Sequence, residues 1–202
     1  MTTSTVYTQV NRVSAAICAQ ALQTSVSDLH EAMGGTLAKA HTMSHLMRPL
    51  ITGVRIAGPA VTAHCPPADN LMMHKSLYLS QKGDVLMVQC PESGAQWGDM
   101  AAFYAKQKGL AGVVVDGFIR DTDDLIEMQS AVWATKIGPS SPQKIGHGSV
   151  NAPIVCDGVY VEPGDLVVAD GDGVIVIPRQ QAESVVGRAL ERKNKEDAVR
   201  QL

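Results

Sequence analysis

The chain has 202 residues, enough to bury a substantial core in one domain, and its 45% hydrophobic and 18% charged residues exclude the composition of a disordered protein. A net charge of −3 and an aromatic content of 4% give no support to nucleic-acid binding, which uses basic patches and stacking rings. We find no export signal and no apolar stretch long enough for a membrane span, and the four scattered cysteines predict reduced thiols and a cytoplasmic protein.

Hydrophobic periodicity predicts helices at the start of the chain. Residues 11–23 and the segment SDLHEAMG form two N-terminal helices, and a hydroxyl side chain within residues 24–27 caps the second one. The segment VRIAGPAVTAHC reads as a strand pair, or as a bent strand broken at Gly58 and Pro59. The segment DNLMMHKSLYLS is an amphipathic helix for which Asp69 is a plausible cap.

The middle of the chain alternates strand and helix. Residues 83–90 form a buried strand, PESGAQW forms a loop, residues 98–109 form a helix, and residues 111–117 form a second buried strand. This order is a βαβ unit, which implies that the two strands are parallel. Residues 121–129 then form a short helix, and VWATK forms one more strand.

The last third of the chain combines short strands with one charged helix. Residues 153–178 are strands separated by Gly, Pro and Asp turns, and Ala169–Gly173 is a hairpin turn, because it lacks the glutamate of a calcium loop. Residues 179–197 form the charged helix. The whole pattern predicts an α/β fold with a single domain over residues 1–202, N-terminal helices and a charged C-terminal helix.

Polar residues follow two of the predicted buried strands at the edge where parallel strands end. Trp97–Ala101 leads into a helix whose free N–H groups and dipole suit a small carboxylate, and Gly98 allows a close approach of the backbone. Arg120 and Asp121 follow the next strand. If the βαβ unit forms, Asp99, Arg120 and Asp121 converge on one pocket, where a Mg²⁺ ion needs only one direct carboxylate and a second reaching it through water.

Spacing by itself favours a plainer interpretation of these residues. An Arg-Asp pair at a helix start is more often a cap with a surface salt bridge than a catalytic pair. Gly-Asp before a helix is a common capping sequence as well.

The wider sequence resembles a known family. The motif GDMAA lies about twenty residues before Arg120-Asp121, which Asp124 follows three residues later. The likeness covers nearly all of residues 25–195. It also includes the segments VSDLHEAMG, RPLITGVRIAGPAVTAHCPPADNLMMH, QKGDVLMV, GLAGVVVDGFIRDTDDL and PGDLVVADGDGVIVIP. These segments resemble the aldolases of 4-hydroxy-4-methyl-2-oxoglutarate and 4-carboxy-4-hydroxy-2-oxoadipate, whose relatives include the regulator of ribonuclease activity A.

The resemblance implies a fold and a set of site residues. It implies a layered α/β sandwich with mixed sheets, assembled as a homotrimer or hexamer with active sites between subunits. It also implies a class II pyruvate aldolase in which Asp121 binds the divalent metal directly, Asp99 binds it through water, and Asp124 is a possible further ligand. Arg120 contacts the keto oxygen, and the backbone of Gly98, Asp99, Met100 and Ala101 receives the substrate carboxylate.

The reaction implied by this resemblance is a retro-aldol cleavage that releases pyruvate. Mg²⁺ is the expected cation, with Mn²⁺ or Co²⁺ as alternatives, and it stabilises the enolate as a Lewis acid. The motif offers no histidine or lysine as base, so a water held by Asp99 removes the proton of the 4-hydroxyl group. Oxaloacetate decarboxylation is an expected side activity, because it passes through the same enolate. The group at C4 of the substrate, and hence the pathway, stays open.

Two other functions compete with the aldolase. The first is a non-catalytic regulator that binds and inhibits a ribonuclease complex; retention of Asp99, Arg120, Asp121 and Asp124 favours the enzyme over it. The second, a methyltransferase, ranks last because no glycine-rich cofactor loop follows the first strand.

Several further polar residues have simpler explanations. His41 and His45 are four apart, as on one helix face, but no third zinc ligand is nearby. For His74, packing in the core and contact with the substrate of a neighbouring subunit are about equally good explanations. Glu191 and Glu196 in the charged helix could close over a neighbouring pocket in a trimer, although such helices are normally solvated. We assign His30 and Glu31 no role beyond the fold or an interface.

Overall fold

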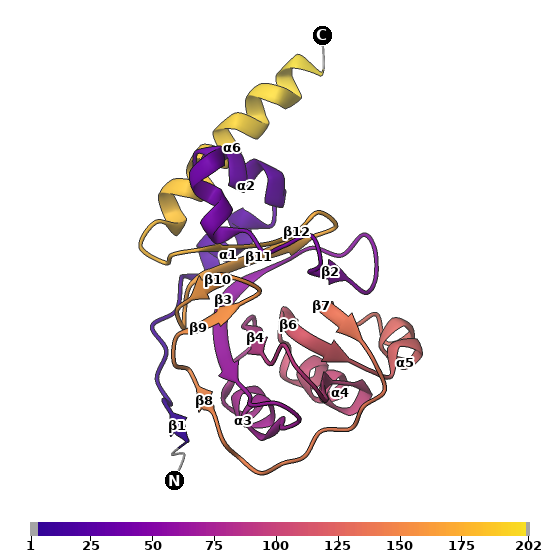
Figure 1. Cartoon of the computed structure of the whole chain (residues 1–202). Coiled ribbons are helices and arrows are strands. Elements are labelled where there is room, and N and C mark those ends of the chain that lie inside the picture. The colour runs from indigo at the N-terminus through magenta and orange to yellow at the C-terminus, as the bar shows by residue number, and fades with distance from the viewer. Residues whose placement is uncertain (1–3, 201–202) are drawn as a thin grey trace.

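The computed structural model describes residues 4–200, which form a layered α/β structure with a mixed sheet (Figure 1). The helices are α1 (Ala15–Ala21), α2 (Val26–Ala32), the 3-10 helix η1 (Gly35–His41), α3 (Leu71–Leu79), α4 (Asp99–Lys108), α5 (Thr122–Glu127) and α6 (Ala182–Val199). No helix within the described residues has the length and the apolar content needed to cross a bilayer.

The strands alternate with the helices in the middle of the chain and follow one another near its end. They are β1 (Thr5–Val6), β2 (Arg48–Pro49), β3 (Ile56–His64), β4 (Val85–Gln89), β5 (Ala95–Trp97), β6 (Gly112–Ile119), β7 (Val132–Ile137), β8 (Ser149–Val150), β9 (Ile154–Cys156), β10 (Val159–Val161), β11 (Leu166–Asp170) and β12 (Gly173–Ile177). Strands β3, β4, β6 and β7 are parallel neighbours, which confirms the parallel arrangement expected for the βαβ unit. The hairpin β11–β12 is antiparallel, as expected for a turn at residues 171–172.

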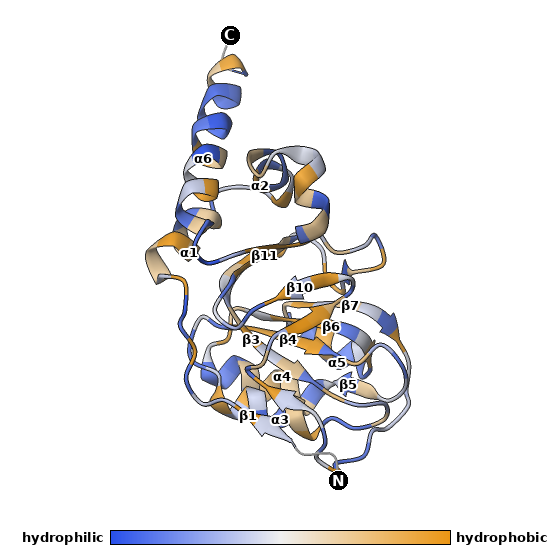
Figure 2. Ribbon diagram, turned by 60° about the vertical axis from the view of Figure 1, so that its left-hand side comes forward, coloured by the Kyte–Doolittle hydropathy of each residue, from blue (hydrophilic) through white to orange (hydrophobic). Residues whose placement is uncertain are grey.

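Three clusters of buried residues separate the layers. One lies between the parallel strands and α3, α4 and α5, and it includes Leu86, Trp97 and Leu125. A second joins the parallel strands to β9, β10, β11 and β12. The third lies between the β11–β12 hairpin and α1, α2 and α6. Figure 2 shows hydrophobic colour on the central strands and hydrophilic colour on the outer turns of α6, the part of that helix that extends away from the body. The core is therefore divided among the layers of one domain.

Strand β3 is continuous, so the expectation of a break at Gly58 and Pro59 was wrong. Its first half, Ile56–Pro59, pairs antiparallel with β11, and its second half, Ala60–His64, pairs parallel with β4. The missing N–H of Pro59 therefore falls where the strand changes partner, and little of either ladder is lost. A Cβ atom at Gly58 would lie 2.2 Å from the carbonyl oxygen of Gly83, so the glycine permits close packing rather than a bend.

The N-terminal helices begin where the serine pattern indicates. Ser25 caps α2 and forms a capping box with Asp28, each side chain accepting the other residue's backbone N–H. Helix α2 ends before Gly34, whose φ of 98° is left-handed, and η1 follows, an element that periodicity did not predict. His41 ends η1 and His45 lies in the turn before β2, so the expected shared helix face of these histidines does not exist.

Candidate active site

The end of the parallel sheet brings two sequence motifs together. Gly98 is the extended N-cap of α4, which starts at Asp99, and β6 ends directly before Arg120. The segment expected to be a loop before α4 ends in a short strand instead, because β5 pairs with the last residues of β6 and the Arg120 amide donates to the carbonyl of Trp97 at 3.0 Å. A three-residue strand carries too little periodicity to be recognised in a sequence. This pairing fixes the start of α4 against the Arg120–Asp121 segment.

Asp121 has an unusual backbone conformation and a close neighbour. Its φ of 56° and ψ of 41° are left-handed, so α5 begins one residue later than expected. Its Oδ2 atom accepts from the amide of Asp99 at 3.4 Å and from Nε of Arg120 at 3.3 Å. A Cβ atom on Gly98 would lie 2.4 Å from the same oxygen. Only glycine at position 98 therefore leaves room for the Asp121 carboxylate. Non-glycine residues with a left-handed backbone, as at Asp121, concentrate at functional sites.

These residues line a cavity of about 240 Å³ at the start of α4. The lining residues are Asn70, Met73, His74, Ala95, Gln96, Trp97, Gly98, Asp99, Met100, Ala101, Arg120, Asp121, Ser141, Pro142 and Lys144. All the predicted site residues are among them except Asp124, which is exposed on the first turn of α5 and does not line this cavity. Arg120 and Asp121 also line another cavity, of about 260 Å³, with Thr122 and Ile137.

Two of the residues that line this cavity carry buried side-chain oxygens with no hydrogen-bond partner among the described residues. Within residues 4–200, these atoms are Oδ1 of Asn70 and Oε1 of Gln96. These two residues are 7% and 0% exposed. Leaving such a group unpaired costs about 1–3 kcal/mol, so native proteins keep few of them. Their grouping around one cavity is the pattern expected of a site that binds a polar ligand.

Arg120 and Lys144 are the cationic side chains that line this cavity, which also contains the carboxylates of Asp99 and Asp121. Nη1 of Arg120 donates to Oγ of Ser141 at 3.1 Å, which holds the guanidinium across the cavity. Burial, together with the charge of Lys144, lowers the pKa of His74, so this imidazole is neutral at neutral pH. The sequence hypotheses placed His74 in the core or at a neighbour's site, whereas the structure places it in the wall of this chain's own cavity.

Sequence reasoning missed Asn70, Gln96, Ser141 and Lys144. The first two adjoin the segments that carry the motif, since Asn70 precedes α3 and Gln96 lies in β5. The other two come from the loop between β7 and β8, which Asp69 holds by accepting the amide N–H groups of Ile145 and Gly146. The Gly- and Pro-rich composition of that loop predicts irregular structure, but nothing in it predicts which edge of the sheet the loop reaches.

The donor set fits a hard divalent cation with few protein ligands. The Asp121 side chain is 30% exposed, and its hydrogen bonds within residues 4–200 are long, at 3.3 and 3.4 Å, so its oxygens are available to a cation. Within the described part of the chain, no group of three or more histidine, cysteine, aspartate or glutamate side chains is close enough to hold a metal by itself. Mg²⁺ characteristically keeps several waters and takes one or two carboxylates, which matches Asp121 with Asp99 nearby.

The fold and site together define an α/β protein in which a helix start lies beside an Arg-Asp pair at the end of a parallel sheet. The family model "RraA-like: Aldolase/RraA" matches residues 26–176, and the chain belongs to this family. It is 36% identical over 160 residues to a protein of Halalkalibacterium halodurans that carries the provisional name 4-hydroxy-4-methyl-2-oxoglutarate aldolase, covering 77% of this chain and 75% of that one. A Burkholderia mallei protein with the same provisional name is 34% identical over 161 residues, covering 76% of this chain and 93% of that one.

A solved structure has the same architecture. The Streptomyces coelicolor protein RraAS2, described as an unusual member of the RNase ES inhibitor RraA protein family, matches with a TM-score of 0.83 and 29% identity. The match covers 96% of this chain and all of the other. This match confirms the expected fold, which is a layered α/β sandwich with mixed sheets of the regulator of ribonuclease activity A type.

Proposed function

We propose that this protein is a divalent-metal-dependent lyase that cleaves a 4-hydroxy-2-oxo di- or tricarboxylic acid to pyruvate and a second oxo acid. The observation that carries the proposal is the convergence of the α4 start, Arg120 and Asp121 on one polar cavity. The provisional aldolase names of two relatives at 34% and 36% identity support the same reaction class.

The chain's own groups bind and orient the pyruvyl half of the substrate. The amides of Met100 and Ala101 have no carbonyl one turn back within α4, and the helix dipole is positive there, so they suit the substrate's 1-carboxylate. Arg120 faces the same cavity and supplies a guanidinium to the 2-oxo oxygen. Two donors on adjacent oxygens fix the plane in which the enolate forms.

Cleavage breaks the C3–C4 bond. The Asp99 carboxylate, through a water molecule, takes the proton of the 4-hydroxyl group, which becomes the carbonyl of the second product. The bonding electrons pass to the pyruvyl fragment as an enolate, and Arg120 stabilises the charge on its oxygen. A proton then returns to C3 and gives the methyl group of pyruvate. A divalent cation held by Asp121, Mg²⁺ for preference, supplies Lewis-acid stabilisation of the same charge when it is bound.

Oxaloacetate decarboxylation follows from the same arrangement. Loss of CO₂ leaves the enolate of pyruvate in the same position relative to Arg120, and no proton has to leave a 4-hydroxyl group. We therefore expect this side activity to depend on Arg120 and less on Asp99 than cleavage of the hydroxy acid does.

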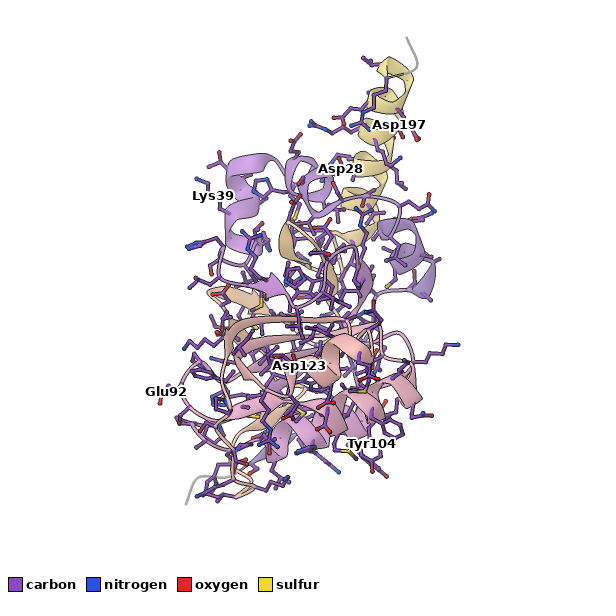
Figure 3. The ribbon with its side chains drawn as sticks, turned by 90° about the vertical axis from the view of Figure 1, so that its right-hand side faces the viewer. Asp28, Lys39, Glu92, Tyr104, Asp123 and Asp197 are labelled. Atoms are coloured by element: carbon purple, nitrogen blue, oxygen red, sulfur yellow. The ribbon has the colours of Figure 1, made fainter. Side chains whose placement is uncertain are left out.

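The test measures pyruvate release from 4-hydroxy-4-methyl-2-oxoglutarate and from oxaloacetate, with Mg²⁺ and with EDTA. We expect turnover with Mg²⁺, loss of turnover with EDTA, and loss of turnover in Arg120→Ala. Asp123→Asn is the control, because Asp123 is an exposed acid on α5 (Figure 3) and does not line the cavity. Absent turnover, or turnover that EDTA does not affect, would contradict the proposal.

A second candidate function is the inhibition of a ribonuclease. It rests on the likeness to RraAS2, whose family is named for an RNase ES inhibitor. A pull-down with a ribonuclease of the RNase E class and a cleavage assay distinguish the two functions. Inhibition together with no pyruvate release from either substrate would favour the regulator.

A further inference from the structure

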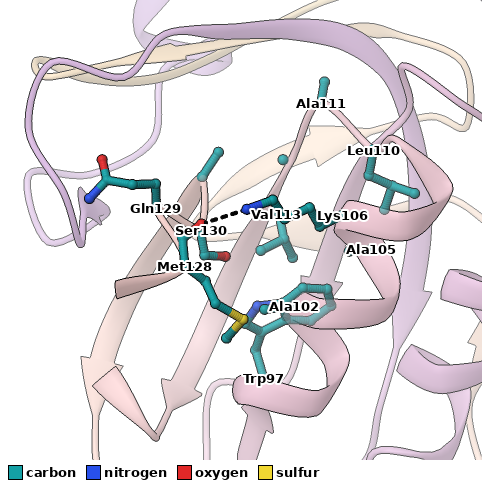
Figure 4. A pocket seen from close by; sticks show the side chains of 12 residues that line it. Trp97, Ala102, Ala105, Lys106, Leu110, Ala111, Val113, Met128, Gln129 and Ser130 are labelled. Atoms are coloured by element: carbon teal, nitrogen blue, oxygen red, sulfur yellow. Dashed lines mark hydrogen bonds between the residues drawn. The ribbon is translucent and has the colours of Figure 1, made fainter. Parts of the chain in front are cut away.

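A second cavity, of about 370 Å³, shares Trp97 with the candidate active site. It lies between α4, the segment that follows α5, and the start of β6 (Figure 4). Its volume falls at the lower end of the range of small-molecule pockets. Ala102, Ala105, Val113 and Met128 give it a largely apolar wall. The cavity therefore has the size and character of a site for a small apolar compound.

The indole of Trp97 supplies a polar group at the inner end of this cavity. Trp97 is 2% exposed, and within residues 4–200 its Nε1 atom has no hydrogen-bond partner. The other tryptophan, Trp133, is satisfied, since its Nε1 donates to the carbonyl of Asp170 at 2.8 Å. Figure 4 shows Trp97 and the Met128 side chain extending toward each other. A thioether is a weak acceptor on a flexible chain, so Met128 can cover the indole and yield to a better acceptor.

One cationic side chain stands at the cavity. Lys106 is exposed, and its ammonium group donates to the carbonyl of Met128 at 3.3 Å. The other lining residues carry no charge. An anion at Lys106 would meet no opposing carboxylate on the wall of the cavity, so the charge pattern favours an acid over an amine.

We propose that this cavity is a binding site for a small apolar monocarboxylic acid with an oxygen acceptor at the end opposite its carboxylate. The carboxylate pairs with Lys106, the apolar body packs against Ala105 and Val113, and the acceptor receives the Nε1–H of Trp97. No step of the lyase chemistry uses this cavity.

A ligand in this cavity would contact the segment that shapes the active site. The carbonyl of Trp97 accepts the amide of Arg120 at 3.0 Å, and Gly98 follows Trp97 in the chain. Trp97 belongs to the walls of both cavities, so a ligand in either cavity contacts this residue.

The test follows the two indole N–H signals of the full chain in a ¹H–¹⁵N spectrum without added metal. The probes are 4-acetylbenzoate, 4-ethylbenzoate, which lacks the acceptor, and acetophenone, which lacks the carboxylate. We expect 4-acetylbenzoate to shift the Trp97 signal saturably and to leave the Trp133 signal in place. We expect each of the other probes to bind at least tenfold more weakly. A Trp97 signal that does not move, or that moves equally with all three probes, overturns the proposal.

Variants locate the bound probe without reference to turnover. Lys106→Gln should raise the Kd for 4-acetylbenzoate at least tenfold, and Ala105→Leu should abolish binding by filling the cavity. Lys108→Gln is the control, because Lys108 lies on the same helix and does not line the cavity. Arg120→Ala should keep the affinity within twofold. If Arg120→Ala abolishes the shift while Lys106→Gln keeps it, the probe occupies the active-site cavity and the proposal is wrong.

Discussion

Two Arg-Asp pairs lie at opposite ends of the parallel strands and differ in their geometry and in the exposure of their carboxylates. Arg12 and Asp84 meet before β4, where Nε and Nη2 of Arg12 donate to the two oxygens of Asp84 at 2.8 and 2.9 Å. The Asp84 side chain is 0% exposed and also accepts the amide of Gln81 at 2.7 Å. Arg120 and Asp121 lie where β6 ends, with one contact of 3.3 Å and side chains 38% and 30% exposed.

The difference separates a structural pair from a pair available for chemistry. The bidentate pair uses both oxygens of Asp84 and attaches the N-terminal segment to the sheet. The loose pair leaves the Asp121 oxygens open to the cavity, at the edge where parallel sheets carry their ligand sites. An Arg-Asp pair in a sequence is compatible with a structural role and with a catalytic role, and only the environment of the carboxylate distinguishes the two.

The largest expected effect is on turnover in Asp121→Asn. Asparagine tolerates the left-handed backbone, and an exposed ion pair contributes at most about 1 kcal/mol, so the variant should keep its stability. Loss of the carboxylate should lower kcat for pyruvate release about 1,000-fold or more, roughly 4 kcal/mol. Steady-state assays with Mg²⁺ measure this, with Asp123→Asn as the control. A variant that keeps a tenth of the wild-type rate would show that Asp121 is not needed for the reaction.

The second effect is on stability in Asp84→Asn. Removing one member of a buried pair leaves the Arg12 guanidinium without its carboxylate and should lower the free energy of unfolding by about 3 kcal/mol. Urea denaturation followed by circular dichroism measures this, and kcat per folded molecule should not change. A large loss of kcat in the folded protein would mean that the two edges of the sheet do not have separate roles.

The third effect concerns Gly98→Ala, which tests the close contact at the loose pair. The new Cβ atom would lie 2.4 Å from Oδ2 of Asp121, so the carboxylate must move. Turnover should fall about 10- to 100-fold, since small displacements of reacting groups have effects of this size. Gly187→Ala is the matched control, because nothing lies within 4 Å of a Cβ atom there, and its helix should gain up to about 1 kcal/mol. Equal turnover in both variants would exclude the steric argument.

The smallest effect is the stabilisation of the folded protein by the cation. At a Mg²⁺ concentration ten times its Kd, binding should raise the free energy of unfolding by about 1.4 kcal/mol, and EDTA should reverse the effect. Thermal denaturation measures this shift in the wild type, in Asp84→Asn and in Asp121→Asn. The shift should remain in Asp84→Asn and disappear in Asp121→Asn. Its persistence in Asp121→Asn would place the cation elsewhere.

Most of the elements could be predicted because their signals are local. Buried strands such as 85–89 and 112–119 appear as apolar runs, and α4, the helix between them, ends at Gly109. Strand β5 and the continuity of β3 could not be predicted. The first depends on pairing with a distant strand, and the second on the partners that β3 has on either side of Pro59.

The sequence by itself determined that Gly98, Asp99, Arg120 and Asp121 follow buried strands, because the apolar runs precede them in the chain. The carboxyl ends of parallel strands lie at the same edge of a sheet, so these residues were expected to meet. The tertiary structure decided which neighbours complete the cavity, adding Asn70 and Lys144 and leaving Asp124 outside. It also decided that Asp121 is left-handed and in contact with Gly98. These outcomes depend on how strands pair and loops pack across many residues, which no local pattern records.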